Sequence, residues 1–243
     1  MQFAKLEWIN NQPYSLDFND IYFNSENGLQ ETEYVFIEHN QLKTRFSSLE
    51  TSLEKESFTV VETGFGTGLN FLTVAIHWLA LAPKYAQLRY ISIEKYPLTL
   101  LDLARAHAMW PQLAVISNEL LQEYTNIKAG INVYSLAGGR IQLVLHADDI
   151  AVVLPLISQK ADAWLLDGFA PAKNAEMWSR NVFEHIANLS QNNTTFATFT
   201  SASAVRRGLQ TVGFKVRKQA GFGKKREMLS GIFAGDTPTA KHD

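Results

Sequence analysis

Short apolar runs alternate with longer amphipathic segments along most of this chain. The runs predict strands, and the segments in which apolar residues recur every three to four positions predict helices. We expect strands over residues 58–62, 89–94, 140–146, 163–167 and 195–200. We expect helices over residues 70–81, 98–109, 176–189 and 202–210. Strands that alternate with helices indicate an α/β fold, in which a mostly parallel sheet is covered on both faces.

The C-terminal part of the pattern changes from alternation to a hairpin. Segments 214–219 and 228–233 flank the turn Gly221-Phe222-Gly223 and predict two antiparallel strands that close the sheet. The pattern leaves three segments without an assigned element, namely 119–127, 131–135 and the turn at 137–139.

The N-terminal part follows a third pattern. Segments 20–24 and 32–37 flank the turn Ser25-Glu26-Asn27-Gly28 and predict strand, turn and strand. This part is too short to bury much apolar surface alone, so we expect it to pack on the rest of the chain. The expected organisation is a small β extension over 1–57, a main domain over 58–235 and a tail over 236–243.

Composition narrows the classes of protein to which the chain can belong. Of its 243 residues 46% are apolar, which is enough for a large core. No stretch has the roughly 20 unbroken apolar residues of a membrane span, and residues 1–8 lack the apolar segment of a signal peptide. We therefore expect a cytoplasmic protein with no membrane partner. There is no cysteine and the histidines show no ligand spacing, so we expect neither disulfides nor a metal site.

The charges are unevenly distributed. The net charge is −2, so the chain as a whole is not a nucleic-acid binder by charge. Residues 206–226, which we call the basic segment, hold no acid, and their cations are Arg206, Arg207, Lys215, Arg217, Lys218, Lys224, Lys225 and Arg226. Such a segment is either a solvated face or a stripe that meets phosphates.

A glycine-rich turn follows the first predicted strand of the main domain. Residues 62–71 read E-T-G-F-G-T-G-L-N-F, so three glycines two apart join a strand to a helix. Such a turn lets a ligand approach the backbone and aims free helix N–H groups at it. A dinucleotide site would require a small residue where Leu69 or Phe71 stands, which argues against NAD.

The turn instead resembles the first motif of class I S-adenosylmethionine-dependent methyltransferases, E-x-G-x-G-x-G. In that motif the acid faces the cationic end of the cofactor. The resemblance implies a Rossmann-like fold and a cofactor site that contains Glu62, Gly64, Phe65, Gly66, Thr67, Gly68 and Asn70.

Further acids follow the other predicted strands. Ligands of doubly wound sheets bind at the carboxyl ends of strands, and Glu62, Glu94, Asp148 and Asp167 each follow an apolar run. Glu94 is placed to accept hydrogen bonds from ribose hydroxyls, and Asp148 would lie near an adenine amino group. A single acid at such a position can be merely a helix cap, a role that we also consider for Asp149. Four acids in succession favour a binding site, so we count Asp167 among the cofactor-binding residues together with Glu62, Glu94 and Asp148.

The loop after Asp167 contains residues suited to an acceptor substrate. It reads D-G-F-A-P-A-K-N over 167–174 and would face the reactive methyl group. Phe169 could stack on a base or close the pocket, and Lys173 could meet a phosphate. Both could instead belong to a well-packed loop, as could Trp178.

Together, segments 62–72 and 167–174 closely resemble the methyltransferase domain of the bifunctional tRNA modification enzymes MnmC, a domain also found alone as MnmD. Segments 22–36 and 221–228 resemble the same family, so the likeness covers nearly the whole chain. It implies S-adenosylmethionine as cofactor and tRNA as partner. The implied reaction converts 5-aminomethyl-2-thiouridine at the wobble position into 5-methylaminomethyl-2-thiouridine.

The chemistry of the implied reaction and the charge pattern give further residues candidate roles. Asp167 would orient the amine and accept its proton, while Lys224, Lys225 and Arg226 would face the RNA. Fused family members carry a C-terminal FAD-dependent oxidoreductase domain, and no second glycine fingerprint occurs here. Fusion or association with such a domain is therefore an expectation. Three alternatives stay open, namely a methyltransferase of small-molecule amines, an NAD-dependent oxidoreductase and a binding module without activity.

Overall fold

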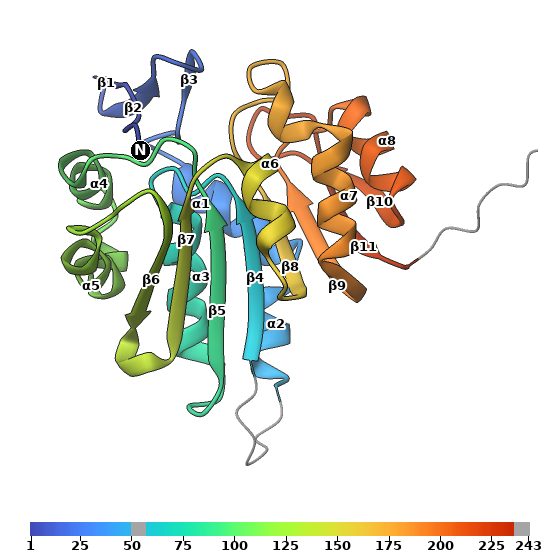
Figure 1. The fold of residues 1–243 in the computed structure, drawn as a ribbon, viewed down its shortest axis with the longest axis horizontal. Coiled ribbons are helices and arrows are strands. Elements are labelled where there is room, and N and C mark those ends of the chain that lie inside the picture. The colour runs from blue at the N-terminus through green and yellow to red at the C-terminus, as the bar shows by residue number, and fades with distance from the viewer. Residues whose placement is uncertain (50–56, 236–243) are drawn as a thin grey trace, which may run out of the picture.

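The computed structural model describes residues 1–49 and 57–235, which form a central sheet with helices on both faces (Figure 1). Within these residues the sheet has eight strands in the order β10-β11-β9-β8-β4-β5-β7-β6. They are β4 (Ser57–Thr63), β5 (Gln87–Ile93), β6 (Gly130–Leu136), β7 (Ile141–Ala147), β8 (Ala161–Leu166), β9 (Ser190–Thr198), β10 (Phe214–Ala220) and β11 (Glu227–Phe233).

The direction of the strands matches the predicted fold. The five central strands are parallel to one another, in the order β7, β5, β4, β8 and β9. Strand β11 is antiparallel to both β9 and β10. The mostly parallel sheet with a closing antiparallel hairpin is thus confirmed. Segment 131–135, left without an element by the sequence pattern, lies in β6, which pairs antiparallel with β7.

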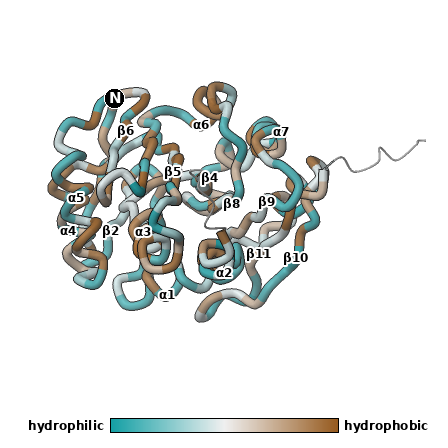
Figure 2. Tube along the Cα trace, turned by 90° about the horizontal axis from the view of Figure 1, so that it is seen from below, coloured by the Kyte–Doolittle hydropathy of each residue, from teal (hydrophilic) through white to brown (hydrophobic). Residues whose placement is uncertain are grey.

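Two apolar layers hold the helices against the sheet. Alternate residues of a strand point to opposite faces, so Val60 belongs to one apolar cluster and Val61 to the other. The first layer is covered by α3 (Leu69–Leu81), α4 (Leu100–His107) and α5 (Ala114–Tyr124). The second is covered by α6 (Ile150–Val153), α7 (Arg180–Asn188) and α8 (Ser203–Thr211). Figure 2 shows α3 and α6 on opposite sides of the central strands.

The N-terminal part is only partly the β extension that the pattern predicted. It begins with a three-stranded antiparallel sheet of β1 (Leu6–Ile9), β2 (Gln12–Ser15) and β3 (Asp20–Ile21). The strand predicted over 32–37 is wrong, because α1 (Gly28–Thr32) continues there into a π-helix, Glu33–Glu38. A short apolar run does not by itself distinguish a strand from a buried helical turn. Here Val35, Phe36 and Ile37 are buried in the first layer, where α2 (Leu42–Ser47) packs beside α3.

Other predicted boundaries shift by a few residues. The helix predicted over 176–189 is divided, because Ser179 has an extended backbone between the 3-10 helix Ala175–Trp178 and α7. The predicted tail over 236–243 lies outside the described residues, as do residues 50–56 next to the expected boundary after residue 57. Among the helices of the described ranges, none has the length and apolar character needed to cross a membrane.

Candidate functional site

A cavity of about 950 Å³ lies at the carboxyl ends of the central strands. The sheet order reverses at β4, because the chain continues to β5 on one side and later to β8 on the other. Ligands of doubly wound sheets bind at such a switch point. The N-terminal segment supplies a further wall of the cavity, and the small β1–β3 sheet lies at the same end of the central sheet (Figure 1).

The glycine turn after β4 forms the floor of this cavity. The Gly64 amide donates to the carbonyl of Ile93 at 2.8 Å and holds the turn against the end of β5. Gly64 has a φ of +87°, and a Cβ there would lie 3.1 Å from the Cα of Gly168. Only glycine therefore allows the turn after β4 and the loop after β8 to approach this closely.

The other residues of this turn that we predicted in the cofactor site differ in whether they line the cavity. Phe65, Gly66 and Thr67 line the cavity. Gly68 lies outside the cavity lining of the described residues and adopts a φ of +71° directly before α3, where the Phe65 ring packs on it. Because the turn is open toward the cavity, its backbone is accessible to a ligand.

Asn70, at the start of α3, joins two of the predicted acids. Its Nδ2 donates to Oε1 of Glu62 at 2.9 Å and to Oδ2 of Asp167 at 2.6 Å. The Thr32 hydroxyl donates to Oδ1 of Asn70 at 2.9 Å and fixes the orientation of the amide. The hydroxyl of Ser92 donates to the second oxygen of Glu62 at 2.7 Å.

Glu62 itself lies behind this network. Its exposed fraction is 0%, and it is not part of the cavity lining in the described residues, whereas Asn70 and Asp167 are. Glu62 therefore meets the cavity through Asn70, and its direct contact with a cofactor stays a prediction. The sequence motif identifies the acid but not the residue that stands in front of it.

The two carboxyl groups differ in their affinity for a proton. Burial raises the pKa of Glu62 to about 8, with a further rise from the charge of Asp167 and opposing hydrogen bonds from Ser92 and Asn70. Burial also raises the pKa of Asp167, to about 6, against hydrogen bonds from the Gly168 amide and Asn70. Two close carboxylates resist simultaneous ionisation. Burial therefore favours the protonated form more strongly at Glu62 than at Asp167.

Glu94 and Asp148 lie at the ends of the next two strands and line the same cavity. Glu94 accepts hydrogen bonds from the amides of Gly66 at 2.8 Å and Tyr96 at 2.9 Å, while its burial raises its pKa. Asp148 is exposed at the rim. Asp149 caps α6 through the Ala151 amide, so the capping role considered from the sequence is confirmed for it.

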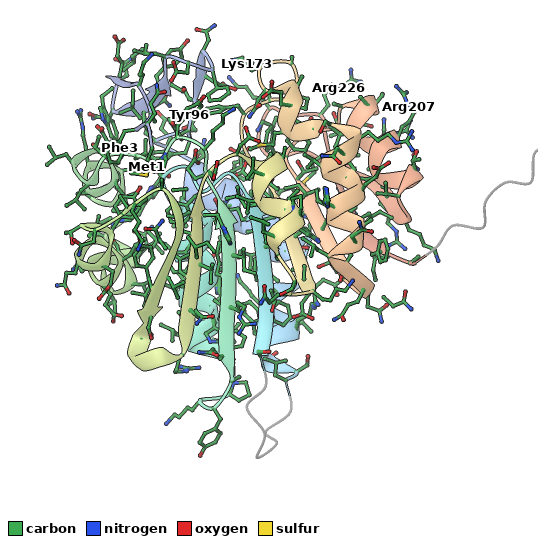
Figure 3. All side chains as sticks on the ribbon, viewed as in Figure 1. Met1, Phe3, Tyr96, Lys173, Arg207 and Arg226 are labelled. Atoms are coloured by element: carbon green, nitrogen blue, oxygen red, sulfur yellow. The ribbon has the colours of Figure 1, made fainter. Side chains whose placement is uncertain are left out.

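The loop after Asp167 packs against the N-terminal segment. The Phe169 ring stacks on Phe18 at a centroid distance of 4.4 Å and meets Tyr22 edge-on at 5.2 Å. Lys173 pairs with Asp20 at 3.2 Å and also donates to the carbonyl of Asn19, so its ammonium is bound within the protein. Figure 3 shows Lys173 at the end of the molecule that carries the β1–β3 sheet. Contact of Lys173 with a phosphate stays a prediction.

The basic segment divides into cations inside and outside the cavity. Lys225 lines the cavity and pairs with Glu31 at 2.6 Å. Lys224 and Arg226 are exposed beside it, and Arg226 and Arg207 lie on one side of the molecule (Figure 3). The hairpin thus brings Lys225 to the cavity, and contact of Lys224, Lys225 and Arg226 with RNA stays a prediction.

His107 is a residue of this site that the sequence reasoning missed. Its Nε2 contacts the Thr67 carbonyl at 2.8 Å, and its Nδ1 contacts the Ser117 hydroxyl at 2.8 Å. A carbonyl only accepts, so Nε2 carries the hydrogen and Ser117 donates to Nδ1. Burial lowers the pKa of His107 and so favours the neutral ring, against the hydrogen bond to Thr67. His107 therefore supports the glycine turn through the hydrogen bond to Thr67. No sequence motif identifies this histidine.

Comparison with known proteins identifies the family. The model of a family of S-adenosyl-L-methionine-dependent methyltransferases matches residues 111–234, about half of the chain. The chain belongs to this family. Its cofactor is S-adenosyl-L-methionine, as the glycine turn and the acids predicted.

Individual relatives agree with the resemblance found in the motifs, which is thereby confirmed. The bifunctional protein MnmC for tRNA 5-methylaminomethyl-2-thiouridine biosynthesis from Methylobacillus flagellatus is 50% identical over 95% of this chain and 35% of its own length. The protein of the same name from Chromobacterium violaceum is 49% identical over 95% of this chain and 34% of its own length. The chain therefore spans about a third of the length of these curated relatives.

A solved structure supports the fold. The crystal structure of MnmC2 from Aquifex aeolicus superposes with a TM-score of 0.71 and covers 99% of this chain and 74% of its own, at 20% identity. The class I methyltransferase fold implied by the glycine turn, with the mostly parallel sheet that the strand pattern predicts, is thereby confirmed.

The cavity residues fit the cofactor. Ligand pockets generally measure about 300–1,000 Å³, and this cavity of about 950 Å³ lies at the upper end of that range. Each oxygen of Glu94 already accepts one amide hydrogen and has a second lone pair, which suits hydroxyl donors of a ribose. Glu94, Asp148 and the turn 64–67 are thus the residues that would hold the nucleoside part.

Proposed function

We propose that this chain methylates the amino group of 5-aminomethyl-2-thiouridine at the wobble position of tRNA and produces 5-methylaminomethyl-2-thiouridine. The names of the relatives, which match 95% of the chain, support this product. The observation that carries the proposal is the Asp167 carboxylate, which is oriented by Asn70 and lines the same cavity as Phe169. A carboxylate and an aromatic ring in one cavity suit a cationic or polar amine next to a base.

The amine presents the main chemical difficulty. A primary alkylamine resembles a lysine side chain, so only about one molecule in a thousand is neutral at pH 7, a cost of roughly 4 kcal/mol. When bound, S-adenosyl-L-methionine supplies a methyl group that its sulfonium has already activated. The protein has then to align the amine and exclude water.

Asp167 meets this need mainly by positioning the nitrogen. The nitrogen lone pair would form the new bond to the methyl carbon, the carbon–sulfur electron pair would stay on sulfur, and S-adenosylhomocysteine would be the other product. One amine proton leaves to Asp167 or to water. A carboxylate also stabilises the ammonium form, so proton removal by Asp167 is secondary to its placement of the nitrogen.

Recognition of tRNA relies on local charge. With a net charge of −2, the chain must gather its phosphate contacts near the cavity. Lys224, Lys225 and Arg226 lie on the turn between β10 and β11, and Lys225 reaches the cavity. We further propose that the protein acts in the cytoplasm and works with an FAD-dependent oxidoreductase domain, fused or separate, that prepares the amine.

Mass spectrometry of tRNA tests this function. Wobble-modified tRNA bearing the aminomethyl group should gain one methyl group on incubation with the protein and S-adenosyl-L-methionine. Asp167→Ala is the negative control, and its cofactor binding is measured in parallel. Cofactor binding without any methylated tRNA would refute the proposal. Equal turnover on the free modified nucleoside would favour the alternative, a methyltransferase of small-molecule amines.

A further inference from the structure

Lys225 occupies a cation site at the opening of the cavity. Its ammonium pairs with the carboxylate of Glu31 at 2.6 Å and lies 4.7 Å from the centroid of the Phe199 ring. All three residues line the same cavity as Asp167. A carboxylate and an aromatic face together form a favourable environment for an ammonium group.

The three residues come from distant segments of the chain. Glu31 lies in α1, Phe199 directly follows β9, and Lys225 lies 194 positions after Glu31 on the hairpin turn. The exposed fractions of the Glu31 and Lys225 side chains are 26% and 48%, so the pair stands near the opening of the cavity. Both charges reach the catalytic region, since Glu31 raises and Lys225 lowers the pKa of Asp167.

Lys225 chemically resembles the proposed substrate. Each presents a primary ammonium on an alkyl carbon, and a site for one also suits the other. One carboxylate beside one ring face holds a single cation, so the amine and Lys225 compete. Lys225 is 48% exposed and lies between the exposed Lys224 and Arg226, so it can swing toward a phosphate outside the cavity.

We propose that Glu31 and Phe199 recognise the cationic form of the substrate amine, and that Lys225 fills their site until RNA phosphate draws it away. The proposal rests on the proposed function, because it takes an aminomethyl group on RNA as the substrate. Binding of RNA phosphate to Lys225 and binding of the amine to Glu31 and Phe199 are then coupled. Free alkylamines, which carry no phosphate, are excluded by the resident lysine.

Binding of n-propylammonium tests the cation site without turnover. Ligand-observed NMR should show that Lys225→Ala binds this probe about tenfold more tightly than the wild-type protein, because the competing ammonium is gone. The Glu31→Gln/Lys225→Ala double variant should lose that gain. Lys218→Ala is the matched control, because Lys218 is on the same hairpin and is paired with Glu227 at 2.7 Å, outside the cavity lining.

Kinetics with modified tRNA provide the second readout. Glu31→Gln should raise KM for the tRNA by about tenfold and change kcat little, since it weakens recognition of the cation rather than the transfer step. Cofactor affinity, measured for every variant, reports whether each one is folded. Lys225→Met, which keeps an unbranched side chain, replaces the alanine variant if that variant fails to bind cofactor.

Equal binding of n-propylammonium to wild type, Lys225→Ala and Lys218→Ala would overturn the proposal, and so would an unchanged KM in Glu31→Gln. The proposed function fails separately. A wild-type protein that never methylates the tRNA would refute that function, whereas a gain of probe binding in Lys225→Ala would still establish the cation site.

Discussion

Replacement of Glu62 by glutamine should make the protein more stable at neutral and alkaline pH. Glu62 is fully buried and is held by Asn70 and Ser92. Glutamine has nearly the same shape and can keep both contacts, because the Ser92 hydroxyl can accept as well as donate. The substitution therefore removes the ionisable group with little change in packing.

The sign and size of the effect follow from the pKa of Glu62. Its pKa rises from 4.5 to about 8 on folding, so between these values the native state holds more protons than the unfolded chain. The contribution of protonated Glu62 to the free energy of unfolding is fully present below pH 4.5 and is lost as pH rises toward 8. At 1.36 kcal/mol per pH unit, the loss between about pH 5.5 and 7.5 is roughly 3 kcal/mol. Glu62→Gln should avoid that loss.

Urea unfolding at a series of pH values measures this difference. With a slope of about 3 kcal/mol per molar urea, the wild-type midpoint should fall by about 1 M over this range relative to Glu62→Gln. Glu184→Gln is the control, because Glu184 is an exposed carboxyl on α7 paired with Arg180 at 2.7 Å. Its midpoints should run parallel to those of the wild type. Parallel midpoints for wild type and Glu62→Gln would refute the reasoning.

Three further predictions concern activity and binding. Asp167→Asn should keep part of the activity, and its kcat/KM should no longer fall below about pH 6 as that of the wild type should. In Asp167→Ala, kcat/KM should fall by about 10²–10⁴-fold. Equal losses of activity in both variants, with cofactor binding intact, would contradict the positioning role. Combined replacement of Lys224, Lys225 and Arg226 by alanine should weaken tRNA binding and flatten its dependence on salt, as a binding titration at several salt concentrations would show. An unchanged slope would make these residues a solvated face. His107→Ala should weaken cofactor binding by about tenfold, because one hydrogen bond that holds the glycine turn is lost. Calorimetry measures this affinity, and an unchanged value would show that His107 does not contribute to the site.

Much of the fold and of the cofactor side of the site was predictable because the signals are local. The strands and helices of 58–233 appear as periodic apolar positions, and the parallel order follows from their alternation. The motif around Gly64 and the acids at Glu94, Asp148 and Asp167 stand where strands end, so the sheet topology alone brings them to one edge.

The N-terminal part shows where local signals were insufficient. Segment 32–37 was predicted as a strand, yet its apolar residues are buried in a π-helical turn against α3. Phe18 and Tyr22 line the cavity, but neither follows a strand of the central sheet, and the likeness of segment 22–36 to the family gave Tyr22 no role in the site. Their contribution depends on how the β1–β3 sheet packs on the Asp167 loop.

The sequence by itself thus determined the doubly wound fold, the methyltransferase motif and the identity of the acids, because each is encoded by residues close together in the chain. Only the tertiary structure placed Asn70 between Glu62 and Asp167, and Lys225 beside Glu31 across 194 positions. Burial and charge pairing in three dimensions set the pKa of each acid. They decide which carboxyl holds a proton and which cation occupies the cavity.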